Sequence, residues 1–173
     1  MNKLPAVAKI AIRNPKANPG SVSGNLIAIA KPNRRELLLL ARWRRKNKRW
    51  FGDDHEITLK STQKWWQTVE ANPLRILFWV KNKKGDKIGH MGLNRFKAKS
   101  CELDNVIRGP KRSPGLMGNA VATLIEWTFK NLPIKNIYLQ TNYDNAHTIR
   151  FYEKSRFKII KNSKPLVKMK YIQ

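Results

Sequence analysis

The stretch that decides the fold of this 173-residue chain opens with a glycine-containing loop: Arg108-Gly109-Pro110-Lys111-Arg112-Ser113-Pro114-Gly115-Leu116-Met117-Gly118-Asn119-Ala120. A helical pattern, an apolar segment at 137–139 and a polar segment at 142–152 follow it. A loop of this kind can hold a phosphate, because free backbone N–H groups meet at the helix start and the helix dipole favours negative charge. A plain turn is the alternative, since the loop is neither a Walker loop nor a GxGxxG fingerprint.

Two segments of this stretch resemble the paired motifs of the general N-acetyltransferase (GNAT) superfamily. Residues 112–117, Arg-Ser-Pro-Gly-Leu-Met, resemble its R/Q-x-x-G-x-G/A signature, and residues 145–157 resemble N-x-x-A/S-x-x-x-Y-x-x-x-G-F. Met117 replaces the second small residue of the first motif. Arg156 replaces the glycine of the second, which argues against a left-handed helix cap there. The resemblance covers about residues 33–172.

Composition indicates one domain with a real core. The length suits a single domain, and one cysteine, Cys101, excludes an internal disulfide. The sequence contains neither an apolar run long enough to span a membrane nor the apolar core of a secretory signal. We therefore expect a cytoplasmic protein, as monomer or homodimer.

The charge of the chain is +25 and is unevenly spread. Residues 1–50 have a net charge of +12, residues 51–100 +5, residues 101–150 +2 and residues 151–173 +6. Such a surface attracts polyanions, including nucleic acid. A lysine-rich coding bias would look the same, so nucleic acid is an open but not favoured partner.

The periodicity of the chain predicts the order β-α-α-β-β-β-α-β-α-β-β. We expect strands near 26–30, 76–80, 87–96, 101–108, 135–141, 157–160 and 167–172, and helices near 33–46, 58–71, 118–131 and 144–155. Asn33 and Glu36 form a capping-box pattern at the first helix. Residues 1–24 are predicted to form an irregular extension with room for a short strand near residues 7–12, and residues 25–173 one α/β (α+β) domain with a central mixed, mostly antiparallel sheet flanked by helices. This is also the fold that the resemblance implies.

Several polar residues stand out within these elements. Period two places Glu102, Asp104, Val106 and Arg108 on one face of their strand, and Cys101, Leu103, Asn105 and Ile107 on the other. Two carboxylates on one face suit either a solvated edge or a cleft. Six cations between 42 and 49 suit either a solvated helix end or an anion-binding patch. No spacing of ligand residues suggests a metal.

The GNAT resemblance implies an acetyl-CoA-dependent N-acetyltransferase and assigns roles to these residues. Tyr152 would protonate the leaving thiol, and Glu102, or alternatively Asp104, would act as the base. The cosubstrate would bind residues of two strands and two helix starts: Asn105, Val106, Ile107, Arg108, Arg112, Gly115, Leu116, Met117, Gly118, Asn119, Asn145 and Tyr152. Core packing for Tyr152 and a simple helix cap for Asn145 are the alternatives.

The acceptor is the least determined part. Arg44, Trp65 and His90 are the candidate acceptor-binding residues, with packing roles as the alternative for each. The segments 43–45, 58–66, 88–92 and 103–109 resemble the subgroup of amino-sugar and ribosomal-protein N-acetyltransferases. We expect a small primary amine, best an amino sugar linked to a nucleotide. A protein N-terminus, or an inactive basic module that binds nucleic acid or ribosomes, are the alternatives.

Overall fold

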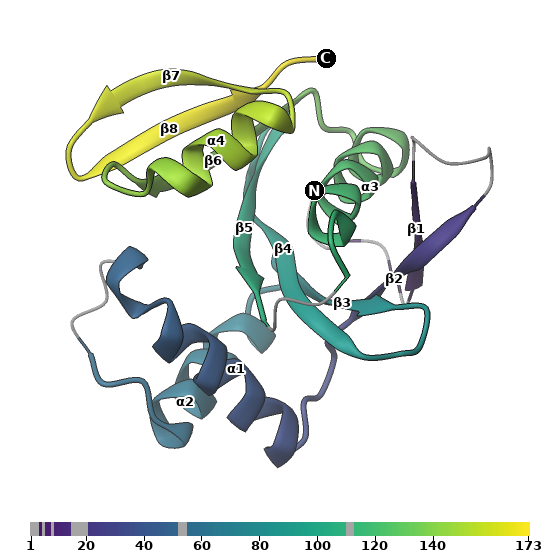
Figure 1. The fold of residues 1–173 in the computed structure, drawn as a ribbon, viewed down its shortest axis with the longest axis vertical. Helices are drawn as coiled ribbons and strands as arrows, with labels where there is room; N and C mark the ends of the chain where they lie inside the picture. The colour runs from purple at the N-terminus through teal and green to yellow at the C-terminus, as the bar shows by residue number, and fades with distance from the viewer. Residues whose placement is uncertain (1–3, 5, 8, 15–20, 52–54, 110–112) are drawn as a thin grey trace.

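A single eight-stranded sheet forms the centre of the computed structural model, which describes residues 4, 6–7, 9–14, 21–51, 55–109 and 113–173 (Figure 1). The strand order is β1-β2-β3-β4-β5-β6-β8-β7, and every neighbouring pair is antiparallel except the parallel pair β5–β6. The strands are β1 (Lys9–Arg13), β2 (Val22–Ala28), β3 (Ile76–Asn82), β4 (Lys87–Lys97), β5 (Ser100–Arg108), β6 (Asn136–Asn142), β7 (Phe157–Ser163) and β8 (Leu166–Tyr171). The mixed, mostly antiparallel sheet predicted from the sequence is confirmed.

The predicted irregular extension is irregular only in part. Strand β1 lies within it, and β2 begins at Val22, before the expected strand. Alternating apolar residues explain this, because Ile12 and Leu26 both face inward and are fully buried in the core beneath the third helix. Strand β1 coincides with the short strand expected near residues 7–12, and it forms one edge of the sheet.

Helices cover both faces of the first half of the sheet (Figure 1). Helices α1 (Arg34–Lys46) and α2 (Leu59–Glu70) both start with capping boxes, at Asn33 and Thr58. They pack onto one face of β3–β5 with a cluster built around Leu40, Trp66 and Trp79. Helix α3 (Leu116–Asn131) packs onto the opposite face with the larger apolar cluster.

Strand β5 changes face part-way along its length, which the period-two prediction missed. Asn105 has φ +50°, and the register to β4 slips by one residue between Asp104 and Ile107. This bulge carries Ile107 into the cluster under α1 and α2, whereas Leu103 lies in the cluster under α3. Placing Leu103 and Ile107 on one face was therefore wrong.

Strands β5 and β6 separate soon after they meet. Their parallel pairing extends only from Ser100 with Asn136 to Glu102 with Tyr138. Beyond Glu102, both strands expose backbone groups along the edges that face each other. This separation opens the sheet at its centre.

The last part of the chain is a helix and a hairpin beside β6. Helix α4 (Ala146–Lys154) packs against β7, with Tyr152 on Phe157 at 5.7 Å between ring centroids. Arg156 follows the helix with φ +67°, so the left-handed conformation forms there without a glycine. No helix in the described part of the chain is long and apolar enough to span a membrane.

Candidate functional site

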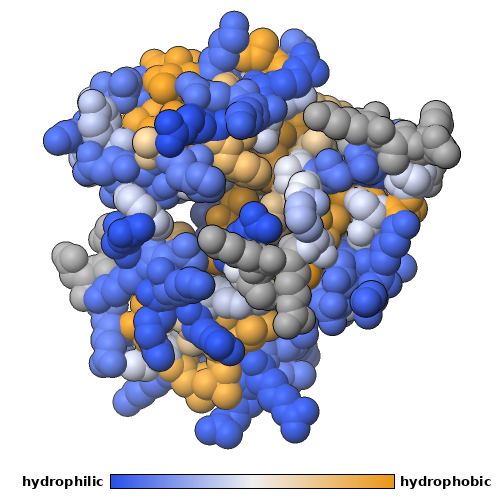
Figure 2. Space-filling model, viewed as in Figure 1, coloured by the Kyte–Doolittle hydropathy of each residue, from blue (hydrophilic) through white to orange (hydrophobic). Residues whose placement is uncertain are grey.

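A cavity of about 750 Å³ lies where β5 and β6 part. Figure 2 shows the surface hollowed between the part formed by α1 and α2 and the part formed by α4, β7 and β8. Its walls come from β5, β6, α4, the start of α3 and the segment after α1. Segments distant in sequence thus meet at one opening in the sheet.

The start of helix α3 has the features of an anion site. Gly115 is its N-cap with φ +77°, and no side chain caps the helix. The N–H groups of Leu116 and Asn119 donate to backbone carbonyls at Ser113 and Gly115. Among the described residues nothing accepts from the N–H groups of Met117 and Gly118, so these two donors are available at the positive end of the helix dipole.

Helix α4 supplies two of the predicted residues. Asn145 is its N-cap, because its Oδ1 accepts from the N–H of Thr148 at 3.2 Å, and it also lines the cavity. Tyr152 lines the cavity as well, although it is 6% exposed. Burial, and after it the negative charge of Asp104, raises the pKa of Tyr152. The phenol therefore keeps its proton at neutral pH.

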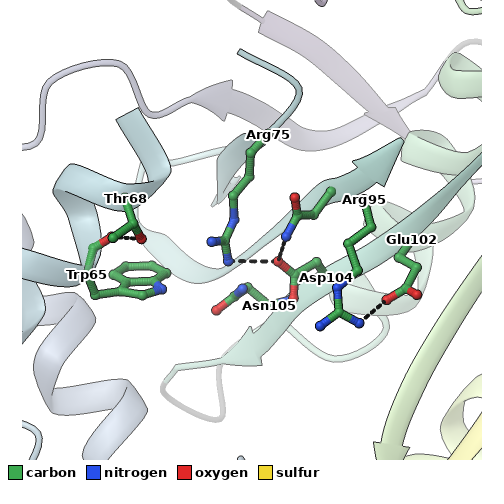
Figure 3. A network of polar contacts seen from close by, with 8 residues as sticks. Trp65, Thr68, Arg75, Arg95, Glu102, Asp104 and Asn105 are labelled. Atoms are coloured by element: carbon green, nitrogen blue, oxygen red, sulfur yellow. Dashed lines mark hydrogen bonds and ion pairs between the residues drawn. The ribbon is translucent and has the colours of Figure 1, made fainter. Parts of the chain in front are cut away.

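The two carboxylates of β5 are both tied to arginines in the cavity wall (Figure 3). Glu102 pairs with Arg95 at 3.1 Å and accepts a longer hydrogen bond from Gln140 at 3.4 Å. Asp104 pairs with Arg75 at 2.8 Å, while its other oxygen accepts the backbone N–H of Asn105 at 2.8 Å. Asp104 thus ties the bulge to the residue that precedes β3.

Arg75 is held in turn by helix α2. Its guanidinium lies 5.7 Å from the ring of Trp65, and Arg44 covers the same ring at 4.3 Å. Figure 3 shows Arg75 reaching from beside Trp65 to Asp104. Trp65 and Arg44 do not line the cavity, and Trp65 is connected to it by its contact with Arg75.

His90 lies in the core rather than in the cavity. It is fully buried, stacked on Trp43 at 6.1 Å and edge-on to Trp79 at 6.2 Å. Burial and then the charge of Arg44 lower its pKa to about 3. The backbone of Asn105 lies close enough to oppose this shift, yet neither ring nitrogen makes a hydrogen bond of good geometry. A neutral histidine shielded from solvent cannot contact an acceptor.

The cavity brings together most of the residues predicted for the cosubstrate and the chemistry. It is lined by Glu102, Asp104, Asn105, Val106, Ile107, Arg108, Met117, Asn145 and Tyr152. Gly115, Leu116, Gly118 and Asn119 lie beside Met117 at the start of α3, where the side chain of Leu116 is buried in the core. Arg112 lies outside the described residues.

Other residues that line the cavity were not singled out from the sequence. Arg75 and Arg95 lie at element ends or bulges, and Gln140 lies on β6. The segment after α1 adds Arg49 and Trp50, stacked at 4.3 Å, so of the cationic run at 42–49 only Arg49 reaches the cavity. Arg45 instead donates to the backbone carbonyl of Ile57.

Known proteins share this architecture. The family model of the acetyltransferase (GNAT) domain matches residues 29–158. No curated protein matches the chain closely. Among solved structures, FdhC, described as a nucleotide-linked sugar GNAT, aligns with a TM-score of 0.71 at 15% identity and covers 86% of each chain.

Two further structures were solved with ligands. Campylobacter jejuni N-acetyltransferase PseH, in complex with acetyl coenzyme A, aligns with a TM-score of 0.67 at 17% identity over 86% of this chain and 97% of that one. Spermidine N-acetyltransferase from Vibrio cholerae, in complex with CoA and spermine, aligns with a TM-score of 0.68 at 17% identity over 85% and 94%. At these identities the similarity shows a shared fold.

Proposed function

Because this chain belongs to the GNAT acetyltransferase family, we propose that it transfers an acetyl group from acetyl-CoA to the primary amine of a small anionic molecule. The observation that carries this proposal is the charge of the cavity wall. Four arginines line it, at positions 49, 75, 95 and 108, against two carboxylates, each paired with one of the arginines. An amino sugar linked to a nucleotide is the best candidate, because it combines an amine with a diphosphate.

The chain's own residues fit acetyl-CoA as the donor. The available N–H groups of Met117 and Gly118 at the start of α3 suit the pyrophosphate. The backbone of β5 beyond Glu102 no longer pairs with β6, so its N–H and C=O groups can bind the amides of the pantetheine arm as an added strand would. Acetyl-CoA supplies an activated acetyl thioester, and when the acetyl group moves to the amine CoA leaves as a thiol, so a proton must reach the CoA sulfur.

Tyr152 is the best-placed donor of that proton. Its raised pKa keeps the phenol protonated, and it lines the cavity from α4 opposite the strand that carries the bulge. Glu102 is the candidate base, acting directly or through a water on the acceptor amine, at the point where β5 and β6 part. One proton thus leaves the amine on one side of the cavity and another enters the leaving group on the other.

Asp104 is better suited to positioning than to proton transfer. Both of its oxygens accept hydrogen bonds of 2.8 Å, one from the Arg75 guanidinium and one from the N–H of Asn105, which fixes the carboxylate between the bulge and Arg75. Through the N–H of Asn105 it fixes the bulge, and through Arg75 it anchors that bulge to α2. We assign Asp104 and Arg75 to orienting the backbone of β5 toward the donor.

The charge of the cavity wall also favours some candidate acceptors over others. A polyamine carries several positive charges, and the two wall arginines outside the carboxylate pairs, Arg49 and Arg108, would repel it. A nucleotide-linked amino sugar brings negative charge to the same wall, and Trp50 offers a flat apolar surface beside it. A protein N-terminus remains the second enzymatic candidate because the cavity is open to solvent between the two halves (Figure 2).

Donor binding can be tested at Gly118. A Cβ added there would meet only Phe151, at 4.0 Å, so the fold accepts a valine. A branched side chain would nonetheless crowd the N–H groups at the helix start, and we expect Gly118→Val to weaken acetyl-CoA binding at least tenfold in calorimetry. Ala122→Val, at an exposed position of the same helix, should leave the affinity unchanged. Absence of acetyl-CoA binding by the wild type would refute the proposal.

The acceptor is identified by thiol release. Amino-sugar nucleotides, free amino sugars, spermidine and short peptides with free N-termini are offered at equal concentration with acetyl-CoA. We expect the amino-sugar nucleotides to give the highest kcat/KM. Reversing one wall charge with Arg49→Glu, outside the two carboxylate pairs, should lower this value and raise the activity with spermidine. Preference for peptides would favour the second candidate.

A further inference from the structure

The β6–β8 part of the sheet has one face that no described helix covers. Helix α4 packs Tyr152 onto Phe157, so the alternate residues of β7, β8 and β6 face the other way. That face carries Lys158, Lys161, Lys168 and Lys170 around the ring of Tyr138, and these five residues are called the lysine face. Its residues are exposed or partly exposed.

The lysines of this face stand directly opposite one another. Lys158 pairs with Lys170, and Lys161 pairs with Lys168, on neighbouring antiparallel strands. Like charges at directly opposite positions destabilise a sheet. In the described part of the chain no carboxylate lies within ion-pair distance of any of the four. The fold therefore maintains a concentrated positive charge at a cost in stability.

An aromatic ring lies among these charges. Lys168 Nζ lies 4.9 Å from the centre of the Tyr138 ring, and Tyr138 is only partly buried. Lysines that track a phosphate backbone, combined with an aromatic ring on an open sheet, are the features by which proteins bind single-stranded nucleic acid. A base stacks on the ring while the lysines contact the phosphates on either side.

We infer that the lysine face binds single-stranded nucleic acid through its phosphate backbone. This surface is distinct from the cavity, since none of its five residues lines it. The two are nevertheless close, because Tyr138 lies beside Glu102 on the neighbouring strand. A membrane surface is the less suitable partner, as the centre of the face is a tyrosine between lysines rather than an apolar group that inserts into lipid.

Salt dependence gives the quantitative test. Four contacts with a single strand give a slope of log affinity against log salt of about −2.8, which weakens binding about 50-fold for a fourfold rise in salt. The variant Lys158→Gln/Lys161→Gln removes two contacts, and its slope should be shallower by about 1.4. Binding is measured by fluorescence anisotropy of a labelled single-stranded oligonucleotide, with RNA and DNA in separate arms.

A matched control separates a defined face from the general charge of the protein. Lys60→Gln/Lys64→Gln removes the same charge from exposed positions of α2. We expect the control to retain the wild-type slope and affinity within about twofold. If both double variants lose affinity equally, binding is a property of the net charge of +25, and the inference is wrong.

Three further measurements test which ligand binds and whether the variants remain folded. Tyr138→Leu should weaken binding of single strands about 5- to 100-fold and leave that of a duplex nearly unchanged. Tighter binding of a duplex, or binding of phosphatidylserine vesicles without binding of oligonucleotides, would overturn the inference. The Lys158→Gln/Lys161→Gln variant should keep wild-type acetyl transfer and a melting temperature at least as high as wild type, since it removes like-charge pairs.

Discussion

The two halves of the sheet differ in how they are covered. Strands β3–β5 have α1 and α2 on one face and α3 on the other, so that even a histidine in β4 is fully buried. Strands β6–β8 are packed on one face and carry lysines on the other. The strands of the two halves pair only over Ser100–Glu102 in the described part of the chain, while one apolar cluster extends under both halves, and the cavity opens directly beyond the pairing.

This difference explains where the chemistry is located. The half that is packed on both faces supplies one wall, with the bulge at Asn105 and the two carboxylates that precede it. The half with one open face supplies the groups of α4 and β6 that face that wall across the gap. Residues at the boundary should therefore affect turnover, whereas residues within either half should affect stability.

The largest effect is expected at the boundary, for Tyr152→Phe. Loss of a general acid lowers turnover by about 10²- to 10⁴-fold, and acetyl-CoA affinity should change little because the ring remains. Steady-state kinetics and calorimetry measure the two quantities. Tyr171→Phe is the matched control, because Tyr171 packs on Phe157 in the same cluster yet does not line the cavity. Unchanged turnover in Tyr152→Phe would mean that Tyr152 packs in the core and does not act as the general acid.

The next largest effect concerns the connection of Asp104 with Arg75. A displaced bulge misplaces the donor, and Asp104→Ala should lower kcat/KM about 100-fold, mostly through a higher KM for acetyl-CoA. Asp104→Asn keeps an oxygen for the N–H of Asn105 and should recover part of the loss.

A double-mutant cycle completes this test. Arg75→Gln and Asp104→Asn should be strongly non-additive, since each removes the same ion pair. If Asp104 were instead the base, both of its variants would lower kcat alike, abolish the acidic limb of the pH–rate profile and leave the KM for acetyl-CoA unchanged. Additive effects of the two substitutions would mean that Arg75 does not act on the bulge through Asp104.

A smaller effect is expected inside the covered half, at His90. Its pKa of about 3 lies below the ordinary value near 6.5, so between these pH values the unfolded chain binds a proton that the folded protein does not. Stability contributed by neutral His90 is thus present above pH 6.5 and is lost as pH falls, by up to about 1.4 kcal/mol per pH unit.

Urea unfolding at pH 7 and pH 5 measures this contribution. Wild type should lose more free energy of unfolding between the two pH values than His90→Leu, whereas the exposed-site control His55→Gln should behave as wild type does. The groups facing His90 are Trp43, Trp79, Arg44 and the bulge backbone at Asn105. An equal loss in His90→Leu and wild type would mean that the imidazole protonates without cost in the fold.

Local sequence patterns predicted the elements well, and the site only in part. The capping box at Asn33, the hairpin of β3 and β4 and the order of helices and strands from β2 onward depend on neighbours in sequence, and they are confirmed. The bulge at Asn105 was missed because period two assumes an unbroken ladder. Arg75 and Arg95 were missed because their carboxylate partners are set by strand register and by a loop, which no short spacing records.

The smallest effect concerns two left-handed residues, one in each half of the molecule. Gly115 has φ +77° and Arg156 has φ +67°, a conformation that costs side chains with a Cβ about 1 kcal/mol or more. Arg156 also stacks on Tyr171 at 5.6 Å, which offsets part of this cost.

Exchanging the residue types should therefore give opposite results. Gly115→Ala should lower the free energy of unfolding by about 1 kcal/mol, since no atom lies within 4 Å of the added Cβ and only the backbone preference changes. Arg156→Gly should raise it by about 0.5 kcal/mol, because relief of the backbone exceeds the lost ring contact and the added freedom of the unfolded chain. Thermal and urea unfolding measure both variants against wild type. A lower free energy of unfolding for Arg156→Gly would mean that the contact of Arg156 with Tyr171 stabilises the fold by more than the left-handed backbone costs.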